Sequence, residues 1–387
     1  MAIELSTITF TEQDDVVPQS EEEIIIFNDG ITNTLAGNDT ITGINNIYIG
    51  PGFVNASSII DTGKGDDIIT GISYYYDALI NLAIINTGDG NDIINGIGGY
   101  SGILNRGSMD TGSGKDIITG INNYGARYEP AIANADFIDT GDGDDRITGI
   151  GGIAISNSGT INTGNGEDSI ICQQQINPDN KPFLDNGNAG LINIGGMFLG
   201  DDNDSLIVEA DVPNRALLKN LNFIGTGEGN DTITSTGVIY NEGVIETGNG
   251  DDSIIVDGGI DYGISSNTYS IYNNGGSINT GNGNDSIIAN GGFESGYNSS
   301  GSVFLGEGED YIKGFGSGDF YGGNGFDTLE LTPGSYTVGI WGEGWDTSAI
   351  FTKGNQLMIT SEFEKLKAGN TIYDFTSLTA GQIITVA

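Results

Sequence analysis

Twelve copies of one short phrase place glycine and aspartate at fixed positions along this chain of 387 residues. Eight copies read Thr-Gly-x-Gly-x-Asp, two keep Gly-x-Gly-x-Asp, and two are degraded by Leu35 at the first glycine or Asp202 at the second. Glycine tolerates positive φ, so turn carbonyls can point inward beside the Asp carboxylate. Ca²⁺ accepts six to eight such hard oxygens in flexible geometry. The turns are therefore predicted to bind Ca²⁺.

The candidate metal ligands are the aspartates and the glycines of these turns. The aspartates are Asp39, Asp67, Asp92, Asp116, Asp145, Asp168, Asp204, Asp231, Asp252, Asp285, Asp310 and Asp327. The glycines are Gly63, Gly65, Gly88, Gly90, Gly112, Gly114, Gly141, Gly143, Gly164, Gly166, Gly227, Gly229, Gly248, Gly250, Gly281, Gly283, Gly306, Gly308, Gly323 and Gly325.

Aliphatic residues flank every turn. The second residue after each motif aspartate is Ile or Leu, and an Ile or Met stands two residues before each of the eight motif threonines. Alternation of this kind is typical of a strand with one buried face. We expect one strand to enter each turn and another to leave it.

The motif resembles the nonapeptide of RTX, or haemolysin-type calcium-binding, proteins, which is Gly-Gly-x-Gly-x-Asp-x-aliphatic-x. Residues 322–329 match that pattern directly, whereas the other copies put Thr or Leu at its first position. The resemblance implies that turn carbonyls and aspartates of stacked turns share each Ca²⁺. It also implies that the matching glycines and aspartates of this chain have that role.

The spacing departs from the nine-residue alternation of that family. Eleven intervals separate Asp39 from Asp327, about 26 residues each. One motif per coil follows, and we expect an all-β fold: a right-handed parallel β-helix or β-roll-like solenoid of about twelve coils with a β-rich C-terminal cap. A second phrase, aliphatic-x-Asn-x-Gly, predicts another corner, where Asn157, Asn241 and Asn273 would stack in a ladder.

The Ca²⁺ motifs would then form a single stripe along one edge. With strands about 4.8 Å apart, twelve coils would extend about 55 Å and offer up to roughly eleven sites. Because two copies are degraded and one interval is 36 residues long, we expect fewer sites to be filled.

The charge is strongly unbalanced, with 53 acidic and 12 basic residues and a net charge of −41. Such an excess opposes compaction. We therefore expect folding to be coupled to Ca²⁺, because a site absent from the unfolded chain turns binding energy into folding energy. The same acidity argues against nucleic acid and anionic lipid as partners, since these require clustered Lys and Arg.

Other features bear on location. The single cysteine, Cys172, allows no intramolecular disulfide and is expected to be a buried thiol. No segment approaches 18 apolar residues, and the N-terminus lacks the pattern of a classical signal peptide. The resemblance to RTX proteins implies type I secretion through an uncleaved C-terminal signal, with which the apolar tail at 382–387 is compatible. An extracellular or cell-surface location follows.

Three regions are expected: an N-terminal cap segment at 1–30, the calcium-binding repeats at 31–330, and a C-terminal cap at 331–387. Ile24, Ile25 and Ile26 should cover the first coil. Two interruptions stand out. Residues 173–198 are predicted to be a surface excursion, and in 208–223 the stretch 213–219 is predicted to form a short helix. The cap aromatics, Trp341, Trp345, Phe351, Phe363, Tyr373 and Phe375, are expected to pack in a core, with glycan binding as the alternative.

Three function classes remain open. The first is a non-catalytic structural or adhesive protein built by Ca²⁺, with surface polysaccharide and other coat proteins as candidate partners. The second is a polysaccharide-acting β-helix enzyme, for which Arg106, Arg127 and Arg146 lie near motifs, although the chain has no His. The third is an ice- or mineral-binding solenoid, which would need an exposed ladder of Thr62, Thr87, Thr111, Thr140, Thr163, Thr226, Thr247 and Thr280. We favour the first and expect no catalytic residues.

Overall fold

The computed structural model describes residues 2–18, 25–46, 50–124, 129–175, 189–211, 217–259, 269–296, 300–342 and 348–387. The chain divides into two compact units, Met1–Val212 and Pro213–Ala387. Within the described residues, the only helices are the short 3-10 turns η1 (Leu5–Thr7) and η2 (Phe375–Ser377). No helix in the described part of the chain is long and apolar enough to cross a bilayer.

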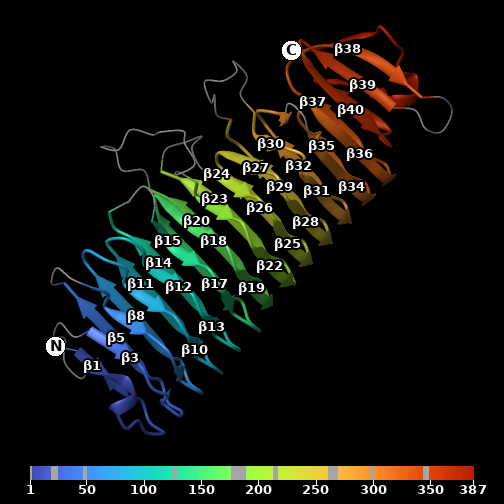
Figure 1. Cartoon of the computed structure of the whole chain (residues 1–387). Coiled ribbons are helices and arrows are strands. Elements are labelled where there is room, and N and C mark those ends of the chain that lie inside the picture. The colour runs from blue at the N-terminus through green and yellow to red at the C-terminus, as the bar shows by residue number, and fades with distance from the viewer. Residues whose placement is uncertain are drawn as a thin grey trace. The chain divides into compact units, whose positions relative to one another are not determined.

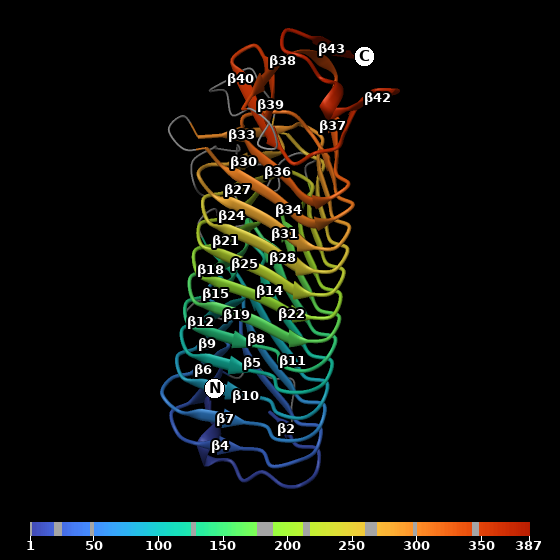
Figure 2. The same cartoon turned by 90° about the vertical axis from the view of Figure 1, so that its right-hand side faces the viewer.

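The first unit is a parallel β-solenoid in which each coil contributes one strand to each of three sheets (Figures 1 and 2). Sheet 1 consists of β1 (Ala2–Glu4), β3 (Ile25–Asn28), β6 (Phe53–Asn55), β9 (Leu79–Asn81), β12 (Ile103–Asn105), β15 (Pro130–Asn134), β18 (Ile153–Asn157) and β21 (Leu191–Asn193). Sheet 2 consists of β4 (Thr32–Asn33), β7 (Ile59–Asp61), β10 (Ile84–Asn86), β13 (Ser108–Asp110), β16 (Phe137–Asp139), β19 (Thr160–Asn165) and β22 (Gly196–Asp201). Sheet 3 consists of β2 (Val16–Val17), β5 (Thr40–Asn45), β8 (Ile68–Ser73), β11 (Ile93–Gly98), β14 (Ile117–Asn122), β17 (Arg146–Gly151), β20 (Ser169–Gln174) and β23 (Ser205–Ala210).

The second unit repeats this plan and ends in an antiparallel cap. Its sheet 1 is β24 (Leu217–Asn220), β27 (Val238–Asn241), β30 (Ile271–Asn273) and β33 (Phe293–Ser295). Its sheet 2 is β25 (Phe223–Glu228), β28 (Val244–Asn249), β31 (Ser277–Asn282), β34 (Ser302–Gly308) and β36 (Gly318–Gly325), continued by β40 (Gln356–Ser361), β39 (Ser348–Lys353), β38 (Gly334–Trp341) and β43 (Ile383–Val386). Its sheet 3 is β26 (Thr232–Ser235), β29 (Ser253–Val256), β32 (Ser286–Ala289), β35 (Tyr311–Lys313), β37 (Thr328–Leu331), β41 (Lys365–Ala368) and β42 (Thr371–Asp374).

The all-β, parallel β-helical class predicted from the repeats is confirmed. Equivalent residues of successive coils pair in register, as Ile60 does with Ile85 and Ile85 with Met109 in sheet 2. The predicted aliphatic positions on both sides of each turn form the core, and Ile69, Ile94 and their equivalents are fully buried. Parallel strands buried on the inner face bring the same side chain of every coil to the same place.

The predicted asparagine ladder is also confirmed at the corner between sheets 1 and 2. In the first unit each amide nitrogen donates to the amide oxygen of the next coil at 2.8–3.0 Å, through Asn28, Asn55, Asn81, Asn105, Asn134, Asn157 and Asn193. In the second unit Asn220 donates to Asn241 and Asn241 to Asn273. These buried amides are thereby satisfied, which fixes the register of the coils.

Other expectations need correction or fall outside the described residues. The helix predicted at 213–219 is wrong for Leu217 to Lys219, which lie in β24. Leu218 pairs with Ile239, and the strand alternation and the asparagine ladder override local helix propensity there. Within the excursion predicted at 173–198, residues 176–188 lie outside the described residues. The flanks of that stretch are the ordinary strands β20, β21 and β22. Ile24, Arg127 and Trp345 also lie outside the described residues, whereas Ile26 is buried in β3 as expected.

The cap aromatics follow the prediction only in part. Phe351 and Phe363 are buried, which confirms core packing for these two side chains. Tyr373 and Phe375 are half-buried, and the Phe375 ring contacts the rings of Phe351 and Phe363. Trp341, in contrast, is 70% exposed, so core packing is wrong for that residue.

The second glycine of most motif turns has no room for a side chain. At Gly283, where φ is +139°, a Cβ would lie 1.8 Å from the carbonyl oxygen of Gly250 in the preceding coil. We predict that Gly283→Ala lowers the unfolding free energy by about 3 kcal/mol or more, because the backbone of two coils must separate. Gly354→Ala is the control, since Gly354 has φ of +61° with open space around it and should cost only about 1 kcal/mol. Urea unfolding of the two variants measures the difference, and equal losses would show that the turns tolerate separation.

Candidate metal centre

The motif turns connect sheet 2 to sheet 3, and each turn ends in its aspartate immediately before the outgoing strand. Turn residues of successive coils also pair, as Lys64 does with Asp89 and Asp89 with Ser113. All twelve motif aspartates are buried, with at most 2% of each residue exposed. The sequence-predicted aspartates therefore lie inside the corner of the coil and stack in one row in each unit.

The first carboxylate oxygen of each stacked aspartate is bonded to the neighbouring coil. In the first unit the backbone N–H of each member donates to Oδ1 of the next at 2.7–2.8 Å, through Asp15, Asp39, Asp67, Asp92, Asp116, Asp145, Asp168 and Asp204. In the second unit the same bonds, at 2.7–2.9 Å, link Asp231, Asp252, Asp285, Asp310, Asp327 and finally Glu364. We call each of these two series an acidic row.

The second oxygen, Oδ2, is the unusual atom. It is buried and has no hydrogen-bond partner among the described residues in Asp39, Asp67, Asp92, Asp116, Asp145, Asp168, Asp252, Asp285, Asp310 and Asp327. A buried acceptor without a donor costs about 1–3 kcal/mol, and more when it is charged. One such atom would be a local defect, but the same atom in coil after coil indicates a missing positive partner.

The threonine of the same coil does not supply that partner. Thr62 Oγ1 lies beside the Asp67 carboxylate, yet it donates its hydrogen bond to the carbonyl of Thr87 at 3.0 Å. Thr87 and Thr247 are engaged in the same way with the next threonine carbonyl. Because one hydroxyl proton faces two acceptors, each such pair lacks one positive charge or one proton.

Burial raises the pKa of these aspartates above the ordinary value of 3.8. It raises the pKa to about 7 in Asp67, Asp116, Asp168, Asp252 and Asp310, and to about 6 in Asp145 and Asp327. Neighbouring carboxylates contribute further. Two unit charges about 4.8 Å apart repel by roughly 3 kcal/mol at an effective dielectric of 20, so a fully ionised row needs cations.

The predicted glycine ligands line the same corner. The carbonyl of Gly63 accepts the N–H of Asp89 at 2.9 Å. The carbonyl oxygen of Gly114 lies against Gly143, and a Cβ on Gly143 would be 3.3 Å from Asp145 Oδ1. Within the described residues no three His, Cys, Asp or Glu side chains gather into a metal cluster. Any ion in this corner would therefore combine Oδ2 with hydroxyl and main-chain oxygens, which is a donor set that suits Ca²⁺.

Two members of the acidic rows were missed from the sequence. Asp15 occupies the row position before Asp39, although its segment has no glycine. Glu364 occupies the position after Asp327. The signal that could have found them is acid-x-aliphatic: Val17 pairs with Ile41, and Leu366 pairs with Leu329, as the second residue after each motif aspartate does.

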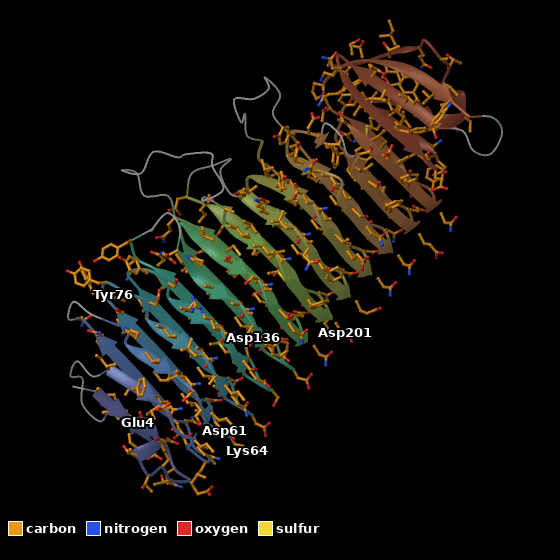
Figure 3. All side chains as sticks on the ribbon, viewed as in Figure 1. Glu4, Asp61, Lys64, Tyr76, Asp136 and Asp201 are labelled. Atoms are coloured by element: carbon orange, nitrogen blue, oxygen red, sulfur yellow. The ribbon has the colours of Figure 1, made fainter. Side chains whose placement is uncertain are left out.

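Outside the corner, the variable residue before each motif aspartate forms a second ladder. The N–H of Asn91 donates to Asp66 Oδ1, and the N–H of Lys115 donates to Asn91 Oδ1. Figure 3 shows Lys64 and Asp201 along this edge of the first unit, with Tyr76 at the opposite edge. The ion pairs of the described residues, Lys64–Asp89, Lys115–Asp144, Lys365–Asp374 and Lys367–Glu330, use none of the motif aspartates.

The structure also places the threonines and arginines on which the alternative functions depend. The eight motif threonines are 0–1% exposed, so they do not form the exposed ladder that would support ice or mineral binding. Their hydroxyls are used inside the turn. Arg146 donates from Nε to Thr148 Oγ1 at 3.1 Å, and Arg106 is exposed. Cys172 is fully buried, as expected, and burial raises the pKa of its thiol.

Comparison with known proteins gives a distant likeness in fold. No protein-family model and no curated protein matches the chain, so the resemblance to RTX repeats depends on the motif alone. Among solved structures, the chain is similar to a hyperactive, Ca²⁺-dependent, β-helical antifreeze protein from an Antarctic bacterium. That match covers 94% of each chain at 15% identity with a TM-score of 0.43. A likeness this distant does not bear on what this chain binds.

The raised pKa values predict how the metal-free protein responds to pH. Between pH 3.8 and about 7 the folded protein binds more protons than the unfolded chain, so its unfolding free energy falls as pH rises across this window. We expect chelator-treated protein to have its highest melting temperature near pH 4–5 and to lose β structure toward pH 8. Thermal circular dichroism at several pH values checks this, and a melting temperature that rises from pH 5 to pH 8 would contradict it.

Proposed function

We propose that the acidic rows bind a series of Ca²⁺ ions and that these ions build the solenoid. The observation that supports this proposal most directly is the buried, unpartnered Oδ2 repeated at ten motif aspartates. Each position offers a carboxylate oxygen, and most add a threonine hydroxyl beside the turn carbonyls. In this proposal the aspartates and glycines predicted from the motif are the ligands. Asp15 extends the first row by one position.

The donor chemistry favours Ca²⁺ over other divalent ions. The chain has no His, and its one cysteine is buried away from the rows, so the nitrogen and sulfur ligands preferred by Zn²⁺ and Cu²⁺ are not available. Mg²⁺ demands a nearly ideal octahedron and retains several waters. Turns built from main-chain carbonyls supply a looser oxygen set, which suits the larger ion.

Ca²⁺ binding would then decide whether the chain folds. Without ions the net charge of −41 and the raised pKa values both oppose the folded state at neutral pH. Each bound ion contributes free energy according to its concentration, about 2.7 kcal/mol per site at one hundred times Kd. A cytosol poor in Ca²⁺ would keep the chain loose, and a Ca²⁺-rich exterior would let it fold.

We infer a secreted or cell-surface protein with a non-catalytic, structural or adhesive role. Its regular coils present ladders of acidic and amide side chains outside the turns, as Asp66 and Asn91 do. Surface polysaccharide and other coat proteins are the proposed partners, and type I secretion is the proposed route. The exposed threonine ladder that would favour ice binding is lacking at the eight motif positions.

Adjacent residues in one turn provide a matched test of the ion row. Asp145 is buried in the row, whereas its neighbour Asp144 is exposed and accepts the N–H of Glu167. Asp145→Asn keeps an oxygen for the Asp116 N–H and places an NH₂ group where Oδ2 stood. We expect this variant to be more stable than wild type in chelator by about 1 kcal/mol, because a buried acceptor becomes a donor. In saturating Ca²⁺ it should be less stable and bind one or two fewer ions.

Asp144→Asn removes the same charge from the exposed ladder and keeps an oxygen acceptor. It should bind as many ions as wild type and change stability by less than about 0.5 kcal/mol in either condition. Ion counting by elemental analysis, together with melting curves with and without Ca²⁺, separates the two variants. If Asp145→Asn behaved as Asp144→Asn does, the buried row would not be the metal site.

A further inference from the structure

The C-terminal end of the second unit differs from the coils before it. Strand β40 continues sheet 2 after β36, and β41 continues sheet 3 after β37, so the cap supplies one further coil. The corner of this coil is only residues 362–364, where a motif coil uses six residues. Glu364 takes the place of the motif aspartate, and its Oε2 accepts the N–H of Asp327 at 2.7 Å.

The turn of the preceding coil, which ends at Asp327, has no threonine at the first position of its motif. Gly322 stands at that position, so the motif threonine hydroxyl is not available to the Asp327 carboxylate. A Cβ on Gly322 would lie 2.8 Å from Asp327 Oδ2 and 1.9 Å from the carbonyl oxygen of Glu362. These two oxygens therefore both lie against Gly322, in an approach that a side chain at this position would prevent. Glu362 has φ of +61°, a conformation that is costly for a residue with a side chain.

The surroundings of Asp327 indicate that this corner needs a positive charge. Asp327 is fully buried. Its Oδ1 accepts the N–H of Asp310 at 2.9 Å, and its Oδ2 has no hydrogen-bond partner among the described residues. The carboxylates of Glu364 and Glu362 add their charge nearby. The neighbouring Lys365 lies 3.5 Å from Asp374 and over the ring of Phe326, so its ammonium is used elsewhere.

We propose that a divalent cation of the Ca²⁺ type binds between the last motif turn and the cap, held by Asp327 Oδ2, the Glu364 carboxylate and the Glu362 carbonyl. This site rests on the proposed function in extending the ion row by one position, but its ligands come from two different parts of the second unit. The ion fastens the cap strand β41 to the repeat coil at β37. It thereby reinforces the strand pairing that covers the edge of the last repeat coil, because an open edge is a weak point of any solenoid.

The test is hydrogen exchange of the full chain during a Ca²⁺ titration. In wild type, amides of residues 365–374 should gain protection as Ca²⁺ is added. Glu364→Gln keeps an oxygen for the Asp327 N–H but lacks the charge. It should bind one ion fewer and need at least tenfold more Ca²⁺ to protect 365–374. The control is Glu246→Gln, which removes the same charge from an exposed side chain of β28 outside the proposed site, and it should match wild type.

The outcomes separate this inference from the proposed function. If wild type binds no Ca²⁺, the proposed function fails and this site fails with it. If the motif coils bind Ca²⁺ while Glu364→Gln matches wild type in ion count and in the protection of 365–374, only the cap site is overturned. Far-UV circular dichroism of Glu364→Gln and wild type in saturating Ca²⁺ shows whether the variant forms the same β structure.

Discussion

The structure depends on one electrostatic constraint: buried aspartates are stacked one strand spacing apart. Parallel coils in register place Asp92 directly next to Asp67 and Asp116, and the backbone satisfies only Oδ1 of each. The remaining charge must be neutralised by protons or by cations. Burial raises the pKa of Asp67 and Asp116 to about 7, so ionising these carboxylates at neutral pH without a cation destabilises the fold.

The other regular features of the coil serve this arrangement. The asparagine ladder satisfies a second corner with neutral amides, and the aliphatic positions fill the interior between the corners. Turn glycines allow successive coils to approach closely enough for Gly114 and Gly143 to be in contact through the backbone. Each of these features fixes the register of the coils, and the register brings the carboxylates together. Replacing one of these features therefore acts on the acidic row even when no aspartate changes.

Much of the fold could be predicted from the sequence, because each repeat carries both the aliphatic alternation of a strand and a glycine–aspartate turn. The burial of Ile69 was predicted correctly, because aliphatic alternation reports burial directly. The features that the sequence did not predict are those that depend on pairing between coils. Asp15 and Glu364 have no glycines around them and are recognised only by their register with Asp39 and Asp327. Leu217 to Lys219 have the composition of a helix, yet pairing with β27 makes them a strand. The sequence left open whether the motif threonines are exposed, and the turn directs Thr62 inward to the next threonine carbonyl.

The most direct measurement is a crystal structure of the protein grown with Ca²⁺ and measured at a wavelength where calcium scatters anomalously. The account predicts a row of anomalous peaks about 4.8 Å apart, each about 2.3–2.6 Å from the Oδ2 atoms of the motif aspartates. A well-ordered solenoid whose Oδ2 atoms bind only water or protons, with no such peaks at saturating Ca²⁺, would contradict it.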